Sequence, residues 1–188
     1  MDAIELLTTR ASNGKLTEPA PDPETLQLAF AAAARAPDHQ ALRPLRVFVV
    51  RGDARDRLGE LMAESVRRVN PAISAEELAK TKAKALRAPM VLVVAAVVQP
   101  HPKVPAIEQQ LSAGTAAHAM LLALHARGFS AIWRTGGFAY DPEVKRAFGL
   151  RPEDAIVGFI YTGTAKQPVP NSTRPVPEAF VHEWGHEH

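Results

Sequence analysis

The sequence contains one long apolar run, Met90-Val91-Leu92-Val93-Val94-Ala95-Ala96-Val97-Val98. Valine and alanine dominate the run and no polar side chain interrupts it, which is typical of a strand that is covered on both faces of its sheet. The run therefore predicts a central, fully buried strand. It is far too short to cross a bilayer as a helix, so we expect no contact with a membrane.

Helices and strands alternate on both sides of this run. Further strands are expected at Val47–Val50, Ser130–Trp133 and Ala155–Gly163. Helices are expected over residues 4–10, 23–36, 54–69, 75–86, 107–126 and 141–148. Taken by itself, the alternation favours a parallel sheet with helices on both faces.

The domain organisation follows from the distribution of proline. Residues 1–164 contain no internal repeat and no linker, which predicts a single domain. Residues 165–188 are rich in proline and cannot form a regular helix, so we expect an arm that is disordered or lies extended on another surface. The prolines in question are Pro168, Pro170, Pro175 and Pro177.

The composition excludes several classes of function. Of the 188 residues, 46% are hydrophobic and 22% charged, as in an ordinary globular protein. The net charge is only +2 and no basic tract is present, so we expect no binding to nucleic acid. The sequence has no cysteine, which excludes disulfides, thiolate nucleophiles and iron–sulfur clusters. In any redox reaction, a cofactor must carry the electrons.

The beginning of the sequence bears on location. Residues Met1–Lys15 mix acidic and basic side chains and lack the apolar centre of a signal peptide. We therefore expect a cytoplasmic protein.

Three segments place cationic or polar groups at the ends of expected elements, where binding residues concentrate. They are Arg10-Ala11-Ser12, Arg35-Ala36-Pro37-Asp38-His39 and Trp133-Arg134-Thr135-Gly136-Gly137. Each has a purely structural explanation, because arginines cap helix C-termini, a tryptophan fills a core and a Gly-Gly pair makes a turn. Considered together, they supply guanidinium and hydroxyl donors for a phosphate monoester, and small residues that allow a flat cofactor to approach closely.

The same segments, in the same order, resemble the motifs of the nitroreductase-like flavoproteins. The residues that carry the resemblance are Ile4–Ser12, Ala33–His39, Gly128–Gly136 and Val157–Thr164. They resemble most the small branch of the family, whose second motif is Ala-Pro-Asp-His. The resemblance implies an α+β fold with a central mixed, mostly antiparallel sheet flanked by helices and an extended C-terminal arm. It also implies a homodimer with FMN at the subunit interface.

The resemblance assigns one group of residues to FMN within a single subunit. The phosphate and the ribityl chain would be held by Arg10, Ala11 and Ser12. Beside the same cofactor would lie Trp133, Arg134 and Thr135. Many family members also place an arginine on the phosphate at a position that Arg174 matches.

A second group is implied to act from elsewhere. Arg35 and His39 would reach the cofactor from the neighbouring subunit. The nicotinamide nucleotide is sometimes placed near Ala123, Leu124, His125, Ala126, Arg127 and Gly128. A helix C-terminus has the wrong polarity for phosphates, which argues against this last assignment.

The sequence departs from the family pattern at two places. The first motif usually reads Arg-Arg-Ser, but Ala11 replaces the second arginine, so only its backbone can contribute. The usual Asn-x-Gln-Pro-Trp after the second motif reads Ala41-Leu42-Arg43-Pro44-Leu45. Arg43 or His39 would then have to replace the family contacts to the polar edge of the flavin.

The resemblance implies an FMN-dependent NAD(P)H oxidoreductase. No catalytic side chain is required, because the flavin accepts hydride from NADH or NADPH and passes electrons to a nitroaromatic, a quinone or a similar small acceptor. A ping-pong mechanism follows, since one face of the flavin serves both substrates. The alternative is a flavin-binding or regulatory protein of the same fold without turnover.

The long helix at residues 107–126 favours a dimer, because it is apolar on nearly every side. Its apolar residues include Leu111, Ala113, Ala116, Ala117, Ala119, Met120 and Leu121. One domain of this size can cover only part of that surface, so we expect a symmetry-related copy to cover the rest.

Two other functions compete with the flavin interpretation. The string His182-Glu183-Trp184-Gly185-His186 matches the H-E-x-x-H pattern of zinc hydrolases. That pattern binds zinc only on a helix, which Gly185 and the upstream prolines disfavour, so we expect no metal site. A classical dinucleotide-binding fold is disfavoured because no G-x-G-x-x-G follows the run Met90–Val98.

Overall fold

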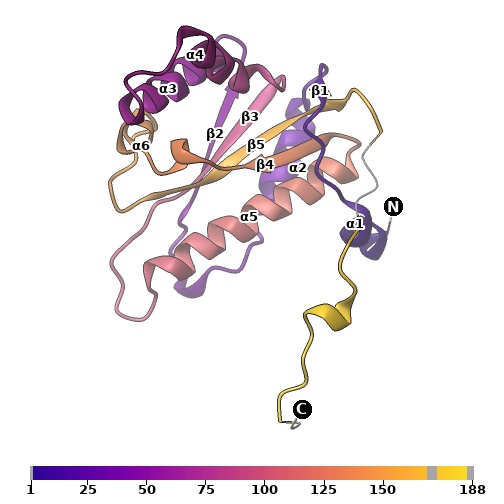
Figure 1. Cartoon of the computed structure of the whole chain (residues 1–188). Helices are drawn as coiled ribbons and strands as arrows, with labels where there is room; N and C mark the ends of the chain where they lie inside the picture. The colour runs from indigo at the N-terminus through magenta and orange to yellow at the C-terminus, as the bar shows by residue number, and fades with distance from the viewer. Residues whose placement is uncertain (1, 169–172, 186–188) are drawn as a thin grey trace.

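The structure is a computed structural model that describes residues 2–168 and 173–185. It contains a sheet with helices on both faces (Figure 1). The strands are β1 (Leu16–Thr17), β2 (Leu45–Arg51), β3 (Met90–Ala96), β4 (Ser130–Arg134) and β5 (Ala155–Ala165). The helices are α1 (Ala3–Thr9), α2 (Pro23–Ala33), α3 (Ala54–Val69), α4 (Ala75–Lys82), α5 (Ala106–Ala126) and α6 (Pro142–Ala147). Short 3-10 helices are η1 (His39–Ala41), η2 (Ala83–Leu86), η3 (Gly137–Ala139) and η4 (Pro177–Ala179).

Polar capping residues fix where the helices begin. The Asp22 carboxylate accepts a hydrogen bond from the Thr25 amide at 2.7 Å, and Pro23 occupies the first turn of α2. Ser74 and Glu77 form a reciprocal capping box at the start of α4. These side chains satisfy backbone N–H groups that a helix start leaves without partners, so the sequence determines these boundaries locally.

Every strand pair in the described part of the chain is antiparallel. β5 lies between β3 on one side and β4 with β1 on the other, and β2 pairs with the outer edge of β3. This confirms the mostly antiparallel sheet that the resemblance implies. The parallel sheet favoured by the alternation of elements is wrong, because β5 is inserted between the two strands that α5 connects.

The strand β3 is the centre of the core, as its apolar sequence predicts. All seven of its residues are at most 1% exposed. Val91, Val93 and Ala95 face a cluster that includes residues of α3 and α6. Met90, Leu92 and Val94 face a second cluster formed with α2 and α5. Figure 1 shows these helices on the two faces of the sheet.

The apolar surface of α5 is divided between the core and solvent. Helix α2 and the sheet cover most of its apolar residues, so only part of the helix surface is left uncovered. Buried in this way are Ala113, Ala116, Ala117, Met120 and Leu121. Leu111, at 62% exposure, and Ile107, at 57%, remain open to solvent near the start of the helix.

The C-terminal segment leaves the body of the protein beside α1. Residues 173–185 run away from the sheet and are exposed along their whole length (Figure 1). Pro170 lies outside the described residues. Within the described residues, no helix combines the length and the apolar character needed to cross a membrane.

Candidate functional site

The end of β4 borders two adjoining pockets, and Arg134 lines both. The first, called here the β4 pocket, has a volume of about 410 Å³. Its lining consists of Met62, Lys84, Arg87, Arg134, Thr135, Gly136, Gly137, Phe138, Phe159 and Tyr161. The second, called here the N-terminal pocket, has a volume of about 310 Å³. Its lining consists of Ser12, Asn13, Gly14, Lys15, Arg134, Gln167 and Pro168.

The β4 pocket is cationic with aromatic walls. Lys84, in η2, places its ammonium group 5.5 Å from the centre of the Phe138 ring. Burial raises the pKa of the Tyr161 hydroxyl, while the charges of Arg87 and Arg134 oppose that rise. The positive charges of both arginines therefore act on the Tyr161 hydroxyl, which lines the pocket. Such a site is suited to a planar ligand that carries or gains negative charge.

Sequence reasoning identified Arg134 and Thr135 but missed Lys84 and Arg87. These two cations lie just before β3, far in sequence from the three motif segments, and the fold brings them to the same pocket as Arg134. The sequence did offer one signal for them, because both cations come just before the buried strand β3, where binding residues are often found.

A buried asparagine shapes the N-terminal pocket. Asn13 is 4% exposed, and its side chain donates to the Gln167 carbonyl at 3.1 Å and accepts from the Lys15 amide at 2.9 Å. Its backbone amide also donates to the Ala131 carbonyl at 3.0 Å. These bonds hold the segment after α1 against β4, which brings Ser12 and Lys15 to the same pocket as Arg134.

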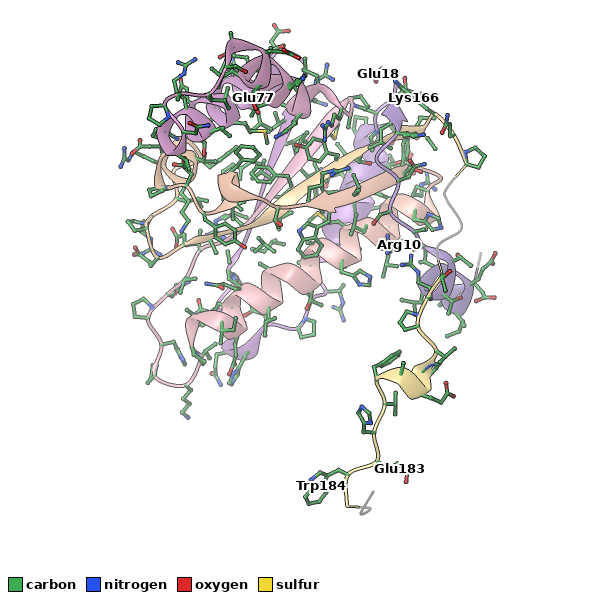
Figure 2. The ribbon with its side chains drawn as sticks, viewed as in Figure 1. Arg10, Glu18, Glu77, Lys166, Glu183 and Trp184 are labelled. Atoms are coloured by element: carbon green, nitrogen blue, oxygen red, sulfur yellow. The ribbon has the colours of Figure 1, made fainter. Side chains whose placement is uncertain are left out.

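Arg10 and Arg174 form a second concentration of positive charge. Arg10 is the C-cap of α1, as the structural explanation of this residue predicts, and is half-buried. Burial and then the charge of Arg174 lower the pKa of the Arg10 guanidinium. Figure 2 shows Arg10 where α1 meets the start of the arm. Ala11, also half-buried, connects this pair to Ser12.

Trp133 and Arg134 point to opposite faces of the sheet, because they are consecutive in a strand. The Trp133 indole packs in the cluster that includes α5, and its Nε1 donates to the Val157 carbonyl at 3.2 Å. The structure therefore places the Trp133 side chain away from both pockets.

Arg35 and His39 also lie away from the two pockets. Both follow α2, on the side of the sheet that α5 covers, and both are exposed. His39 Nδ1 lies 2.8 Å from Glu108 Oε2 on α5. Neither residue lines a pocket with Arg134, so a contact with a ligand bound there requires a second copy of the chain.

The segment considered for the nicotinamide nucleotide ends α5 and precedes β4. Its residues are Ala123, Leu124, His125, Ala126, Arg127 and Gly128. Leu124 is fully buried, and Arg127 pairs with Glu24 of α2 at 3.6 Å. None of these six residues lines the β4 pocket or the N-terminal pocket, so the fold does not bring this segment to them within one protomer.

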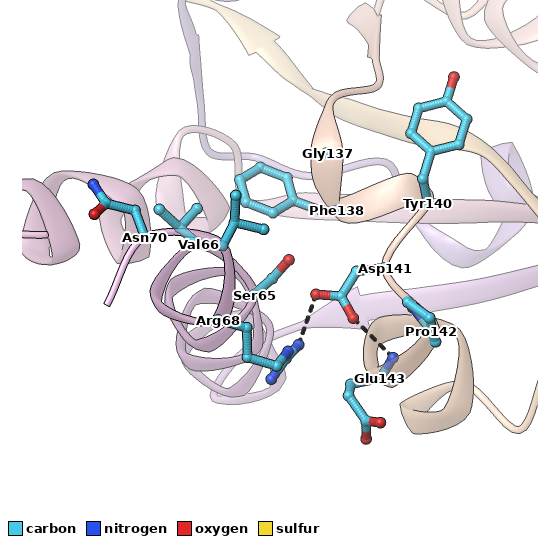
Figure 3. A pocket seen from close by; sticks show the side chains of 11 residues that line it. Ser65, Val66, Arg68, Asn70, Gly137, Phe138, Tyr140, Asp141, Pro142 and Glu143 are labelled. Carbon is cyan, nitrogen blue, oxygen red and sulfur yellow. Dashed lines mark hydrogen bonds and ion pairs between the residues drawn. The ribbon is translucent and has the colours of Figure 1, made fainter. Parts of the chain in front are cut away.

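A further pocket, of about 650 Å³, lies between the end of α3 and α6. Figure 3 shows that Arg68 and Asp141 form an ion pair on its wall, at 2.8 Å. Burial acts to raise the pKa of Asp141, but hydrogen bonds from Ser65, Arg68 and the Glu143 backbone outweigh it and lower that pKa. With its arginine already paired and Glu143 on the same wall, this pocket does not have the chemistry of an anion site.

The zinc pattern is not supported by the local fold. Residues 182–185 are exposed and not helical, and His186 lies outside the described residues. Among the described residues, no group of three or more histidine, aspartate or glutamate side chains is arranged to hold a metal ion. The described part of the pattern, residues 182–185, therefore lacks the helical geometry that the motif needs.

The fold and the two pockets define a class of α+β protein suited to a planar cofactor with a phosphate group. A model of the Nitroreductase family matches residues 7–164. The Escherichia coli (strain K12) protein named "Putative NAD(P)H nitroreductase YdjA" is 40% identical over 182 residues, which cover 96% of this chain and 98% of that protein. The chain therefore belongs to the nitroreductase family, an oxidoreductase family, as the motif resemblance indicates.

Solved structures confirm the predicted fold. A nitroreductase-like family protein from Bacillus cereus superposes with a TM-score of 0.81 at 22% identity, over 98% of this chain and 97% of that one. A protein from Desulfovibrio desulfuricans, described as a "putative nitroreductase in complex with fmn", gives a TM-score of 0.73 at 22% identity, over 96% and 95% of the two chains.

Proposed function

We propose that the protein is an FMN-dependent NAD(P)H oxidoreductase. The observation that carries the proposal is that Arg134 joins a cationic, aromatic-walled pocket to a second pocket that contains Ser12 and Lys15. The FMN complex of the Desulfovibrio protein and the name of the E. coli relative support this choice.

The donor set fits FMN. A phosphate monoester needs directed donors and positive charge, which Arg10, Ser12 and Arg174 supply. The isoalloxazine ring needs flat walls and small residues, which the aromatic side chains and Gly136–Gly137 of the β4 pocket supply. No dinucleotide-binding loop of the G-x-G-x-x-G type, which would hold the pyrophosphate of FAD, is present in the sequence, and this favours FMN.

The protein's own side chains bind and tune the cofactor. When bound, FMN supplies hydride acceptance from NADH or NADPH and electron delivery to a second small substrate. Lys84, Arg87 and Arg134 place fixed positive charge in the β4 pocket, which favours the more negative state of a bound ring. Thr135, Gly136 and Gly137 also line that pocket, and the two glycines have no side chain to keep a ligand from the backbone.

The second substrate is proposed to be a small planar acceptor such as a nitroaromatic or a quinone. Phe138, Phe159 and Tyr161 line the β4 pocket and favour a flat apolar ring. Since both substrates would use the same opening in turn, we expect ping-pong kinetics. In this mechanism no side chain acts as a nucleophile or general acid.

We propose that the active form is a homodimer with FMN at the subunit interface. In one chain, the exposed apolar residues of α1 and α5 have no cover, and Arg35 and His39 do not reach the pockets. The exposed residues concerned are Ile4, Leu7, Ile107 and Leu111. The arm adds Val176, Phe180, Val181 and Trp184, and Figure 2 shows Trp184 at its far end. A second copy would cover these surfaces and supply the missing contacts.

The visible spectrum of the purified full chain tests this proposal. We expect a yellow protein from which denaturation releases FMN, identified by mass, and anaerobic mixing with NADH or NADPH should bleach the flavin within seconds. A protein that is colourless and that leaves the fluorescence of added FMN unchanged would refute the flavin proposal. Bound FMN that neither nucleotide reduces would favour the alternative, a flavin-binding protein without turnover.

A further inference from the structure

The loop after α2 is held in an unusual backbone conformation. Gln40, Ala41 and Arg43 have φ angles of 63°, 52° and 52°, in the left-handed region that disfavours residues other than glycine. Strain of this kind persists only where surrounding contacts impose it, and it concentrates at functional sites. The loop also contains His39, which the proposed function places on the cofactor of the neighbouring subunit.

Hydrogen bonds to two side chains, those of Asp38 and Gln99, hold this conformation. The Asp38 carboxylate accepts from the backbone amides of Leu42, at 3.1 Å, and Arg43, at 2.7 Å. The Gln99 side chain donates to the Leu42 carbonyl at 3.0 Å. Gln99 is itself fixed by Gln109 of α5, which is 2% exposed and bonds both the amide and the carbonyl of Gln99, at 2.9 and 2.8 Å. The loop is thus tied to the first turns of α5.

The same part of α5 determines the orientation of the His39 ring. Glu108, next to Gln109, lies in the first turn of α5, where the helix dipole favours a carboxylate. Its Oε2 is 2.8 Å from His39 Nδ1. A carboxylate can only accept, so Nδ1 carries the proton and Nε2 of the neutral ring is left as an acceptor. Nε2 is the ring nitrogen available to a group outside the chain, because the side chains of His39 and Glu108 are exposed, at 49% and 44%.

We propose that Glu108 is a positioning residue for the flavin site: it fixes the ring orientation and the tautomer of His39 so that Nε2 is presented to a hydrogen-bond donor of the cofactor held by the neighbouring subunit. This inference rests on the proposed function. A carboxylate that orients a functional imidazole through its second nitrogen is an established physical arrangement. Here it compensates for the polar family residues that the segment 41–45 lacks.

The first test reads the tautomer without FMN. Protein labelled with ¹⁵N-histidine is compared as wild type, Glu108→Ala and Glu108→Gln, with the two ring-nitrogen shifts of His39 assigned through His39→Gln. We expect the proton on Nδ1 in wild type, a shift toward the other tautomer in Glu108→Ala, and partial restoration in Glu108→Gln, whose amide oxygen still accepts. His118, exposed on the same helix, should not change. Identical His39 spectra in wild type and Glu108→Ala would overturn the proposal.

The second test is a double-mutant cycle on the dissociation constant of FMN, measured by flavin fluorescence. We expect Glu108→Ala and His39→Ala each to weaken FMN about 3- to 10-fold, and the double variant to be no weaker than His39→Ala alone. Glu76→Ala, which removes another exposed helical glutamate with an ion pair at 2.6 Å, is the control and should bind as wild type. Effects that multiply would show that Glu108 does not act through His39. Failure of wild type to bind FMN would refute the proposed function instead.

Discussion

Arg10 lies close enough to Arg174 for the two charges to interact. The pKa of the Arg10 guanidinium is lowered first by burial and second by the positive charge of Arg174. Two cations brought together in this way repel each other, and an anion between them relieves the repulsion. Arg10 is the C-cap of α1 and Arg174 lies in the C-terminal arm, so segments from near the two ends of the chain come together here. We therefore expect this pair to hold the phosphate group of the proposed cofactor.

Replacing Arg10 should therefore weaken the phosphate-dependent part of binding. We expect Arg10→Gln to raise the dissociation constant of FMN about 10- to 100-fold, because one charge-assisted contact is lost. The dissociation constant of riboflavin, which lacks the phosphate, should change much less. Fluorescence titrations with both ligands measure this difference. Arg67→Gln, on the exposed side of α3, is the control. An equal loss for FMN and riboflavin would remove Arg10 from the phosphate site.

Lys84 should tune the redox potential of a bound flavin. Its ammonium group lies in the β4 pocket above Phe138, and reduction adds negative charge to the ring. We expect Lys84→Gln to lower the two-electron midpoint potential by about 30 mV, equivalent to about 1.4 kcal/mol. Dye-linked anaerobic titration measures this potential. Lys80→Gln, which removes an exposed lysine on α4, should leave the potential unchanged; the same shift in both variants would contradict a local effect of Lys84.

Gly158 is required because Trp133 occupies the space beside it. A methyl group there would overlap the indole nitrogen that donates to Val157. We expect Gly158→Ala to reduce the free energy of unfolding by about 1–3 kcal/mol, measured by urea denaturation. Gly114→Ala adds the same methyl group 3.7 Å from the far end of the same ring, which is ordinary contact. That variant should match wild type or gain up to about 1 kcal/mol, since alanine favours a helix. Equal losses would contradict a role for the indole.

The elements of the fold could be predicted from sequence, but their pairing could not. The apolar run Met90–Val98 correctly predicted β3, and Asp22 with Pro23 marked the start of α2. Strand direction depends on how many helices lie between strands. The hairpin of α3 and α4 returns the chain so that β2 and β3 are antiparallel, whereas the single helix α5 makes β3 and β4 run parallel. The later strand β5 then pairs between β3 and β4, and no local pattern in the amino-acid sequence predicts that pairing.

Side-chain roles that depend on tertiary contacts also escaped prediction. Lys84 and Arg87 carry no motif, yet they line the pocket at the end of β4. The sequence Leu150-Arg151-Pro152 gives Arg151 the appearance of a free loop residue, but its side chain bonds the buried Asp154 at 2.9 Å. The motif resemblance assigns Arg134 and Ser12 to the same cofactor, and the structure brings both residues to neighbouring pockets. It gave no information about the carboxylate that holds His39.

Asp154 should make stability depend on pH. It is 2% exposed and accepts from the Val98 amide at 2.9 Å and the Arg151 amide at 2.8 Å. Burial acts to raise its pKa, but the Arg151 side chain and these backbone bonds outweigh burial, so the folded-state pKa is lowered. Its stabilising contribution is then complete above the unfolded-state pKa of about 3.9 and is lost as the pH falls through the folded-state value.

We accordingly expect Asp154→Asn to cost about 1–3 kcal/mol of unfolding free energy at pH 7, because the amide cannot accept from all of these donors. The difference from wild type should shrink as the pH is lowered below about 4. Urea denaturation at several pH values measures both. Glu64→Gln, an exposed change on α3, should stay near wild type throughout. A cost for Asp154→Asn that stays constant down to pH 2 would show that the ionised carboxylate is not the stabilising group.

The exposed face of α5 provides the test of the dimer. Leu111 is 62% exposed and lies on the opposite side of the sheet from Val69, which is 86% exposed at the end of α3. If a second copy covers α5, Leu111→Arg buries a charge in the interface and should convert the protein to a monomer at low micromolar concentration, whereas Val69→Arg should remain a dimer. Light scattering measures both masses.

FMN that contacts two subunits binds only the dimer, so Leu111→Arg should also weaken the binding of FMN. Added FMN should in turn shift the Leu111→Arg variant back toward the dimer. A monomeric wild type that still binds FMN tightly would show that one chain builds the whole site, and the roles proposed for Arg35, His39 and Glu108 would fall with the dimer.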